Sequence, residues 1–505
     1  MSFGSYLFFI FVGILYLNYM LRKIRIVLAA LFFIGVTLLF LDFTGTIHAW
    51  LGWMAKIQFL PAVLAANTVV VVGLIMLTAI CGRVYCSVIC PLGILQDIFS
   101  WIRGRLKKKD RFRFSYHSEN KWLRYGFLTA FLICLIFGAH SIAILVAPYS
   151  AYGRIAANLF TPVYQWINNI FANLAERVDS YAFYSTEVWL KSLPSLIIAI
   201  STLVILFIFA WVGGRNYCNS VCPVGTILGF FSRRSIIAPV IDTEKCRNCG
   251  LCGKQCKSSC IDMKNHKIDY SRCVVCMDCI DTCKEGAISY TGRFFQKSQC
   301  QKEAEKQQET GVNRRTFLTT AVLTGAAVTA QAQNIEPLIK VPEKHQRKTP
   351  IVPAGSLSIK NFTNRCTGCQ LCVSACPNQV LRPSSSLATL MQPKISYEKG
   401  YCRPECTACS DVCPAGAIRP ISIEEKSSTQ IGHAVVNPEI CVVNTDGVDC
   451  GNCARHCPAG AITLVNNVPA VNEEMCIGCG ACENLCPARP LAAIHVEGHE
   501  VHKTI

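Results

Sequence analysis

The sequence predicts a multi-domain fold in which an α-helical membrane domain is joined to small α+β modules rich in cysteine. Three observations predict this fold. Long apolar runs crowd into residues 1–230, whereas residues 240–505 are mostly polar. The chain of 505 residues holds 32 cysteines, far above ordinary usage, and they recur at the short spacings of metal ligands. An arginine pair followed by a mildly apolar stretch, at 313–333, separates two cysteine-rich regions.

The first region, residues 1–235, is predicted to be a polytopic membrane domain. Five apolar runs each reach the roughly 17–25 residues that are needed to cross a hydrocarbon core about 30 Å thick. A weaker sixth run, 316–332, lies inside the arginine-pair stretch and is expected to act as a signal-anchor helix. The five predicted spans cover residues 3–20, 26–43, 62–80, 122–146 and 195–212.

The charges of the loops predict the orientation of this domain. Basic residues concentrate at 22–25, 81–121 and 213–313, and lysine and arginine favour the cytoplasmic side of a membrane. We therefore expect the N-terminus and the loops 44–61 and 147–194 to face outward. Five spans then end inside, and the sixth takes the chain out. The net charge of +17 is explained by these loops, so no nucleic-acid partner is expected.

Residues 313–333 have the layout of a twin-arginine export signal placed inside the chain. Arg314 and Arg315 precede the apolar run, and Ala330 and Ala332 form the A-x-A pattern of a cleavage site. The sequence therefore predicts that the cysteine-rich regions before and after this stretch lie on opposite sides of the membrane. Polar linkers are expected on either side, at 296–312 and 334–360.

An internal repeat with a constant offset of 132 residues follows the third and fifth predicted spans. Each copy reads Gly-Arg-x-Tyr-Cys-x3-Cys-Pro-x-Gly, with Cys86 and Cys90 in the first copy and Cys218 and Cys222 in the second. Cysteines four apart share one helical face, so the two pairs can converge. They are candidates for a metal site, a redox dithiol or a quinone site, with simple packing as the alternative. No catalytic residue is assigned, and the absence of Cys-x-x-Cys-His predicts no c-type haem.

Residues 240–295 are predicted to form a cytoplasmic two-cluster ferredoxin module of bacterial type. The run Cys-x2-Cys-x2-Cys-x3-Cys occurs twice, and the fourth cysteine of each run is expected at the cluster of the other run. Four cysteines also suit zinc, but two such runs favour [4Fe–4S] clusters. Lys257 and Lys284 replace the usual proline, and Cys260 and Cys300 are expected as free thiols. The expected ligand sets are Cys246, Cys249, Cys252 and Cys283, and Cys273, Cys276, Cys279 and Cys256.

Four further runs predict periplasmic ferredoxin regions at 361–422 and 436–498. Each run ends in Cys-x2-Cys-x3-Cys-Pro, although the second and third have a longer first gap. We pair the first run with the second and the third with the fourth; pairing the first with the fourth keeps the ligands but changes the grouping. The expected sets are Cys366, Cys369, Cys372 and Cys413; Cys402, Cys406, Cys409 and Cys376; Cys441, Cys450, Cys453 and Cys486; and Cys476, Cys479, Cys482 and Cys457. Six [4Fe–4S] clusters are thus predicted in all.

These motifs resemble those of two ferredoxin-type families. Residues of about 60–290 are similar to the NapH family, which includes relatives of NosR. The similarity lies in the two Cys-x3-Cys-Pro motifs and in the paired cysteine runs after the last span. Residues of about 313–495, with a twin-arginine signal and four runs, are similar to the NapG family. The resemblance implies a natural fusion, with oxidation of membrane quinol and electron transfer to periplasmic reductases. The chain departs from both families in its order, its internal signal and its lysines Lys257 and Lys284.

The sequence therefore predicts an iron–sulfur electron-transfer protein of the quinol dehydrogenase type in a bacterial inner membrane. Residues 240–312 are expected in the cytoplasm and 334–505 in the periplasm. The expected partners are the lipid bilayer, the quinone pool (menaquinol or another quinol), a periplasmic redox protein and, as another donor, cytoplasmic ferredoxin. No P-loop, dinucleotide fingerprint or nucleophile–base pair points to other chemistry. The alternative is an accessory factor that matures a periplasmic metalloenzyme or senses its redox state.

Overall fold

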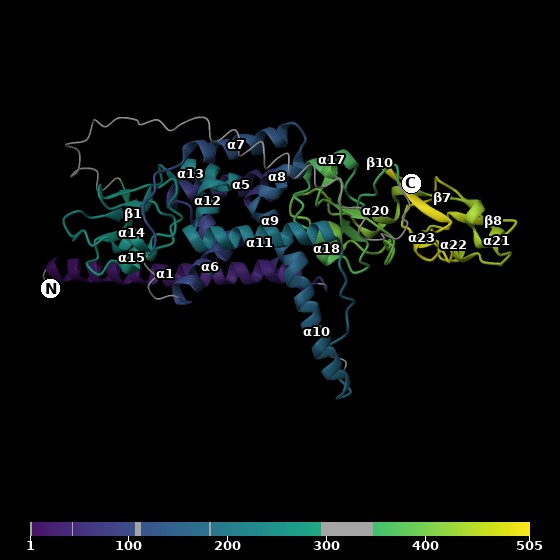
Figure 1. The fold of residues 1–505 in the computed structure, drawn as a ribbon, viewed down its shortest axis with the longest axis horizontal. Coiled ribbons are helices and arrows are strands. Elements are labelled where there is room, and N and C mark those ends of the chain that lie inside the picture. Colours follow the sequence, from purple (N-terminus) through teal and green to yellow (C-terminus); the bar gives the residue numbers. More distant parts are fainter. Residues whose placement is uncertain (1–2, 43, 107–112, 181–182, 294–346) are drawn as a thin grey trace.

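The computed structural model describes residues 3–42, 44–106, 113–180, 183–293 and 347–505, with side chains described from residue 20 onward. These residues form three parts in a row (Figure 1). We call residues 237–293 the inner module, residues 3–236 the helical domain, and residues 347–505 the outer modules. The helical domain lies between the other two. The predicted signal at 313–333 and the linker at 296–312 lie outside the described residues.

The N-terminal helix α1 runs without a break from Phe3 to Leu41. The prediction of two spans at 3–20 and 26–43, joined by a basic loop at 22–25, is therefore wrong. Basic residues inside an apolar stretch predict a loop, because charged side chains need water or an ionic partner. In the structure they need no loop, since carboxylates of other elements reach them while they remain in the helix.

The ion pairs of α1 also reverse the predicted orientation of the N-terminus. Arg22 Nε lies 2.9 Å from Asp278 Oδ1 of the inner module, and Arg25 Nη1 lies 3.2 Å from Asp97 Oδ2 of the helical domain. The middle of α1 is thus fixed beside the inner module. The helix enters the helical domain from that side, and the N-terminus was predicted on the opposite side.

Two other predicted spans, at 62–80 and 122–146, are each broken into two helices. In the span predicted at 62–80, the side chain of Asn67 caps the helix that begins at Thr68. In the second, Gly138 has φ +79°, a conformation that favours glycine, and separates the two helices. The remaining predicted span, 195–212, is one continuous helix. The observed bounds are α4 Phe59–Leu64, α5 Thr68–Cys81, α7 Lys121–Ile136, α8 His140–Val146 and α11 Leu193–Gly213.

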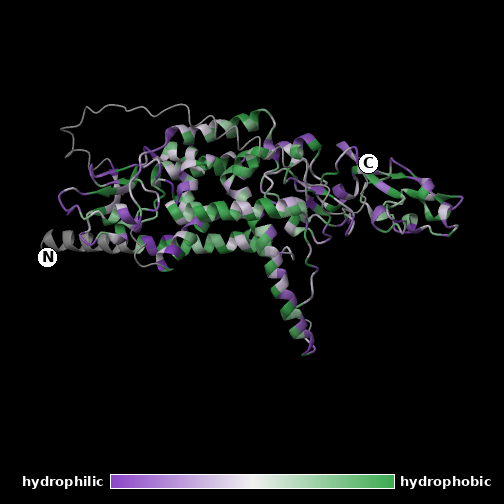
Figure 2. Cartoon of the chain, in the orientation of Figure 1, coloured by the Kyte–Doolittle hydropathy of each residue, from purple (hydrophilic) through white to green (hydrophobic). Residues whose placement is uncertain are grey.

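Two helices of the described residues are long and apolar enough to cross a membrane, Met20–Leu41 and Leu193–Gly213. A helix of about 21 residues is about 31 Å long, which matches a hydrocarbon core of about 30 Å. Apolar residues predominate along the helical domain (Figure 2), and many large ones, such as Val69, Ile136 and Ile208, are exposed. Such an apolar exterior is typical of a protein that is associated with a membrane.

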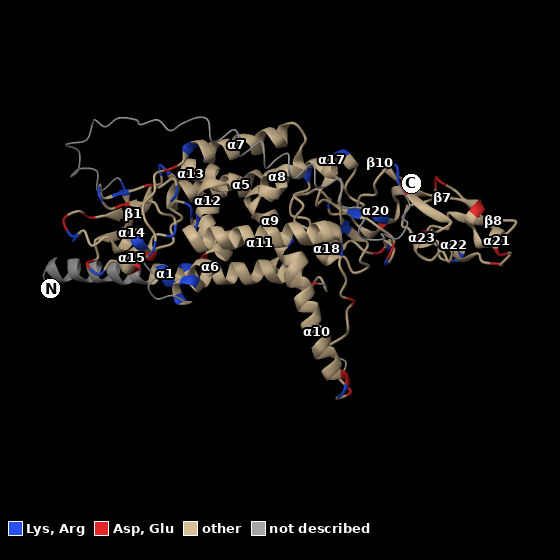
Figure 3. Cartoon of the chain, in the orientation of Figure 1, with Lys and Arg blue, Asp and Glu red and all other residues tan. Residues whose placement is uncertain are grey.

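Four helical segments connect the inner module with the outer modules: α1, α4–α5, α7–α8 and α11. Their inner ends meet the inner module at Arg22, Gly82, Arg124 and Gly214. Their outer ends meet the outer modules. Helix α1 contacts α18 (Leu371–Ala375), and Ala65, after α4, contacts Gly416. In α8 the Ser141 Oγ donates to the Ala388 carbonyl, and in α11 the Ser195 Oγ accepts from Gln370. Lys and Arg gather where the helical domain meets the inner module (Figure 3).

Shorter helices fill the space between these four segments. The second cysteine of each Cys-x3-Cys-Pro copy immediately precedes a helix that begins at its proline, a residue favoured in the first turn. Helix α10 projects from the domain as an arm (Figure 1). The bounds are α2 Thr46–Leu51, α3 Trp53–Lys56, α6 Pro91–Leu106, α9 Pro148–Ile155, α10 Thr161–Glu176, α12 Asn216–Ser220 and α13 Pro223–Ser232, with π-helical turns at Tyr85–Ile89 and Ala156–Phe160.

The inner module is a small α+β unit with two short helices and two antiparallel strand pairs. Its long pair joins the two ends of the module, with Ile237 opposite Gly292 and Ile241 opposite Ile288. The core consists of the cysteines and a few aliphatic residues such as Ile261 and Ile268. The elements are β1 Ile237–Ile241, α14 Leu251–Gln255, β2 Ile261–Asp262, β3 Lys267–Ile268, α15 Asp278–Thr282 and β4 Ile288–Gly292.

The second outer module repeats the plan of the inner module, with a long strand pair, β7 with β10, and a short pair, β8 with β9, whereas the described strands of the first outer module are one pair, β5 with β6. Tyr397 is buried between the two outer modules, and its hydroxyl donates to the Gly478 carbonyl at 2.5 Å. The elements are α17 Ile359–Arg365, α18, β5 Leu381–Pro383, β6 Pro393–Ile395, α19 Ala408–Asp411, α20 Ile423–Ser427, β7 Thr429–Val436, α21 Val442–Thr445, α22 Asn452–Arg455, β8 Ile462–Val465, β9 Val468–Val471, α23 Ala481–Asn484 and β10 Ile494–Thr504.

The first outer module packs closely on the helical domain. A Cβ atom added to Gly153 of α9 would lie 2.3 Å from the backbone oxygen of Cys369. Gln370 also donates to Ser195 Oγ at 2.8 Å and accepts from Asn158 at 2.7 Å. The two parts therefore share one continuous core, which extends from residues beside the inner module to Cys366 and Cys372.

The close approach at Gly153 predicts the effect of enlarging it. The change Gly153→Val must push the first outer module away, and overpacking of this kind costs about 1–3 kcal/mol. We expect amide hydrogen exchange over α18 to accelerate by about tenfold or more. The matched control is Gly73→Val in α5, where an added Cβ meets nothing within 4 Å. Equal exchange in the two variants would contradict the packing described here.

Candidate metal centres

The inner module brings its eight expected ligands together at two places. At the first, the pKa of Cys252 is raised to about 11 by burial and by nearby thiols, which are those of Cys283, Cys246 and Cys249. The second is a pocket lined by Cys256, Cys273, Cys276 and Cys279, with Cys260 beside them. Each place thus receives one cysteine from the other run, which is the crossed arrangement of a two-cluster ferredoxin.

The first outer module groups its cysteines in the same crossed way. Burial raises the pKa of Cys372 well above its usual value, and the thiols of Cys366, Cys369 and Cys413 raise it further. The thiols of Cys376 and Cys406 lie near those of Cys402 and Cys409. The structure therefore joins the first run with the second. The alternative of joining the first run with the fourth is not what the structure shows.

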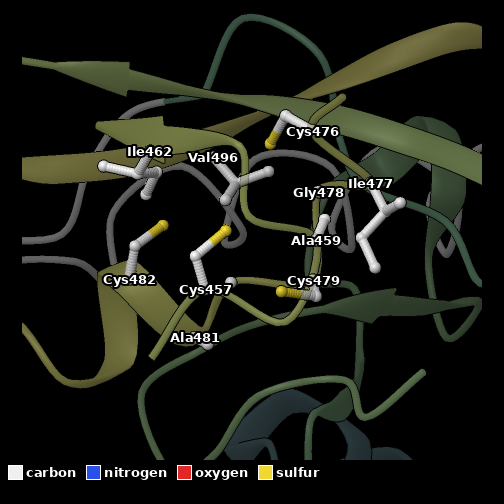
Figure 4. Close-up of a pocket in the computed structure, with 11 residues that line it drawn as sticks. Cys457, Ala459, Ile462, Cys476, Ile477, Gly478, Cys479, Ala481, Cys482 and Val496 are labelled. Atoms are coloured by element: carbon white, nitrogen blue, oxygen red, sulfur yellow. The ribbon is translucent and has the colours of Figure 1, made fainter. Parts of the chain in front are cut away.

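The second outer module has a pocket into which four cysteine side chains point (Figure 4). They are Cys457, Cys476, Cys479 and Cys482, with Ile462 and Val496 as apolar lining. Burial raises the pKa of Cys479 to about 12, and the thiols of Cys457 and Cys476 add to this effect. The remaining set lies in the same core, where Cys453 is close to Cys450 and Cys486 and is accompanied by Cys441.

A left-handed residue follows the second cysteine in most of the runs and orients these side chains. The residue takes a positive φ in five of the six runs, and two of the five are not glycine: Met277 with φ 62° and Gln370 with φ 64°. The chain then turns sharply into a short helix that bears the third cysteine. The fourth cysteine follows that helix and lies near the thiols of the neighbouring run, as Cys283 and Cys413 do.

The donor sets suit clusters better than single ions. Within the described residues, no group of three or more His, Cys, Asp or Glu side chains is spaced to hold one metal ion. A four-iron cube is larger than an ion and holds its thiolates further apart. Four cysteines at each centre, buried or partly buried except for the exposed Cys249, fit the ligand set of a [4Fe–4S] cluster. Binding requires the thiolate form, so the raised pKa values mean that cluster loading releases protons.

Cys260 is a residue that the sequence pattern did not assign. It was expected as a free thiol outside the pattern, yet its Sγ lies 3.4 Å from Cys256 Sγ and it lines the same pocket. The spacing Cys256-x3-Cys260, just after the place of the usual proline, was the only indication in the sequence. The structure thus places five thiols around one inner centre.

The two Cys-x3-Cys-Pro copies converge in the helical domain. All four thiols, those of Cys86, Cys90, Cys218 and Cys222, are buried, and each lies within electrostatic range of the other three. We call these four residues the cysteine quartet. The quartet belongs to the same core as Val274 of the inner module and Cys369 of the first outer module. It therefore lies between the inner and outer centres.

Each copy of the repeat sends its arginine to the other copy. Arg215 Nη1 donates to the Cys86 carbonyl at 2.7 Å, and Arg83 Nη2 donates to the Cys218 carbonyl at 3.2 Å. The glycines of the repeat make room for this exchange. A Cβ at Gly93 would lie 2.6 Å from Arg215 Nη1, and one at Gly225 would lie 2.8 Å from Arg83 Nη2.

A buried ion-pair chain joins the quartet to the inner module. Asp97 accepts two hydrogen bonds from Arg215, at 2.9 and 2.8 Å. Lys257 Nζ lies 3.6 Å from Asp97 and 2.9 Å from Asp278. Lys257 thus occupies the position of the usual ferredoxin proline because its charge is needed at this interface. The second departure, Lys284, is exposed and has no such role.

Comparison with protein families agrees with these groupings. A family model described as a 4Fe-4S binding domain matches residues 64–109 and 195–239, which contain the two copies of the repeat. Two models described as 4Fe-4S dicluster domains match residues 365–418 and 446–489 of the outer modules. No solved structure matches the chain.

Several curated proteins are similar to parts of the chain. The methylamine utilization ferredoxin-type protein MauM of Methylorubrum extorquens is 33% identical over 34% of this chain and 84% of its own length. The ferredoxin-type protein NapG of Escherichia coli is 32% identical over 26% of this chain and 64% of its own length. The ferredoxin-type protein NapH of Haemophilus influenzae is 25% identical over 42% of this chain and 63% of its own length. Two other MauM proteins are matched over 64% and 65% of their lengths, so the chain spans just under two thirds of these relatives.

The position of Cys260 predicts that it can replace a neighbouring ligand. In Cys256→Ser, the Cys260 thiol is close enough to take over, so purified protein should keep its full iron content. The double change Cys256→Ser/Cys260→Ser should lose one cluster, measured as iron and acid-labile sulfide per chain. If the single variant loses as much iron as the double variant, Cys260 has no such capacity.

Proposed function

The chain belongs to the family of NapH-, NapG- and MauM-like ferredoxin-type iron–sulfur proteins, and from this premise we propose that it conducts electrons across a bacterial inner membrane. The electrons pass between the quinone pool, or a cytoplasmic ferredoxin, and a periplasmic redox partner. One observation is the main support. Cysteine sets of ferredoxin type are packed against both ends of a single helical domain, and the core between them is continuous.

The 24 cysteines in the crossed groups are the proposed ligands of six [4Fe–4S] clusters. The inner module holds two clusters and the outer modules hold four. A bound cluster supplies one-electron chemistry at each centre, and the chain's own residues fix where these centres lie and exclude water from them. Burial and hydrogen bonds to the sulfurs set the potentials of such centres. The backbone amides of Gly368 and Ala461, for example, donate to Cys366 Sγ and Cys457 Sγ at 3.4 and 3.3 Å.

The route from the quartet to the outer modules passes two buried tyrosines. Tyr85 lies near Cys86 and Cys90, and Tyr149 lies near Tyr85 on one side and Cys369 on the other. Both side chains are almost completely buried. A closely packed path of buried side chains suits a conduit across an apolar layer of about 30 Å.

The topology that we propose has four crossings in the helical domain and an N-terminus in the cytoplasm. Basic residues at the inner ends of the four segments support this orientation through the positive-inside rule. Residues 240–312 are then cytoplasmic and 334–505 periplasmic, with 313–333 as the fifth crossing or as a cleaved twin-arginine signal. Such export moves a folded domain, so the thiols of the outer modules would already hold iron when they reach an oxidising compartment.

Electron entry can be tested with the full chain in lipid nanodiscs. Menaquinol or dithionite-reduced ferredoxin is added without oxygen, and cluster reduction is followed by visible absorbance and by electron paramagnetic resonance. We expect one of these donors to reduce both the inner and the outer clusters. If neither donor reduces any cluster, the conduit is wrong and the role of an accessory factor for a periplasmic metalloenzyme is favoured.

The side of the membrane can be tested by protease protection. In intact spheroplasts, added protease should digest residues 340–505 and leave an N-terminal epitope tag intact. The change Arg314→Lys/Arg315→Lys should protect the outer modules as well, because the export signal is lost. Digestion of the tag in spheroplasts, or of the outer modules in the variant, would contradict this topology.

A further inference from the structure

The cysteine quartet is surrounded by positive charge. Arg83 and Arg215 are completely buried, and each has one guanidinium nitrogen directed at a quartet sulfur: Arg83 Nη2 lies 3.6 Å from Cys86 Sγ and Arg215 Nη1 lies 3.9 Å from Cys218 Sγ. A buried arginine is costly unless hydrogen bonds and negative partners compensate for the lost water, because burial removes the solvent that would otherwise stabilise its charge.

Only one of the two arginines has a carboxylate. Arg215 is paired with Asp97, but the residue at the matching place in the second copy is Gly229. A Cβ at Gly229 would lie 2.0 Å from Arg124 Nη2, so this place is filled by a third buried arginine. The hydrogen-bond partners of Arg83 are Asn219 Oδ1, the carbonyls of Ser271 and Cys218, and Cys86 Sγ. If the four thiols of the quartet were neutral, none of these hydrogen-bond partners of Arg83 would carry a negative charge.

Hydrogen-bond donors are directed at every sulfur of the quartet. Cys222 Sγ accepts from the Gly225 amide at 3.3 Å, and Cys90 accepts from the matching amide of Gly93. Cys218 Sγ accepts from Gln96 Nε2 at 3.2 Å, and Cys86 Sγ faces Arg83. Cys90 and Cys222 also precede the N-termini of α6 and α13, where the helix dipole favours negative charge. All these features stabilise sulfur as thiolate.

We propose that Cys86, Cys90, Cys218 and Cys222 are the four ligands of a seventh iron–sulfur cluster, which relays electrons between the inner and outer modules. Four thiolates around a cluster supply the negative charge that Arg83 lacks. The family model that matches both copies is described as 4Fe-4S binding, and the structure supplies the ligands. A cluster held by these thiolates would take one electron from an inner cluster and pass it on to an outer cluster, so no proton or other reactant is consumed.

The place of the quartet explains how the two ends of the conduit are coupled. On the inner side, Lys257 follows the ligand Cys256 and is linked through Asp97 to Arg215. On the outer side, Tyr85 and Tyr149 lead to Cys369. A centre at this point divides the crossing into two shorter steps. This role as a relay rests on the proposed function, whereas the ligand set does not.

The ligand set is tested by counting iron in the full chain. Wild-type protein should contain seven clusters, and Cys86→Ser/Cys218→Ser should contain six, with at least two irons lost per chain and the spectra of the other clusters unchanged. Cys134→Ser, a change at a cysteine of α7 outside the quartet, is the matched control and should lose none. Six clusters in wild-type protein, or unchanged iron in the double variant, would overturn the proposal, as would reversible disulfide formation between these thiols in iron-replete protein.

The relay is tested separately from the ligands. In the double variant, a cytoplasmic donor such as reduced ferredoxin should still reduce the inner clusters, while reduction of the outer clusters should slow by about a hundredfold or more. If the iron loss is found and outer reduction is unchanged, the cluster exists but is not the relay. If no donor reduces wild-type protein, the proposed function fails and the iron count still decides the site. Mössbauer spectra of wild-type protein give the cluster number even if the variant fails to fold.

Discussion

The exchange of arginines between the two repeat copies is the interaction on which the helical domain depends. Each guanidinium crosses to a cysteine carbonyl of the other copy, so the two helix ends are fixed to one another and the four thiols are brought together. The cost of burying an unpaired guanidinium is several kcal/mol. Such groups persist only where the surrounding structure provides compensation. Here the compensation is Asp97 on one side and, on our proposal, a metal-bound set of thiolates on both.

The same charges also join the parts of the molecule. Asp97 receives Arg215 and Arg25 from two helices and Lys257 from the inner module. Asp278 receives Lys257 and Arg22. Four cations and two anions thus form one network at the junction, which is largely buried except at Arg22. Because an isolated charge is costly there, the inner module has a single favourable position against the helices. A centre in one part is in this way kept at a fixed distance from a centre in the next.

The ferredoxin modules obey a different constraint, which is local. In most of the runs a left-handed residue after the second cysteine turns three thiols toward one point, and the fourth cysteine, after the short helix, lies near the thiols of the neighbouring run. Two runs must therefore pair, and the two centres of each pair must be close neighbours. The outer modules extend this arrangement away from the helical domain, so that their last pair of centres is the furthest from it.

The sequence by itself determined the modular plan and the cysteines of each run, because these follow from spacings within short segments. The tertiary structure decided which outer runs pair and that the two repeat copies converge, because both depend on residues far apart in the chain. The break after Leu64, the continuity of α1 through Arg22 and Arg25, and the role of Lys257 were not determined in this way. The break after Leu64 comes with a local cap by Asn67. The other two features depend on partners far along the chain: Asp278 lies 256 residues from Arg22 and Asp97 lies 72 residues from Arg25. In the sequence alone, a basic residue within an apolar run is compatible with a loop between two helices and with one continuous helix. Only the tertiary structure decides between them, because it alone brings the carboxylate within reach.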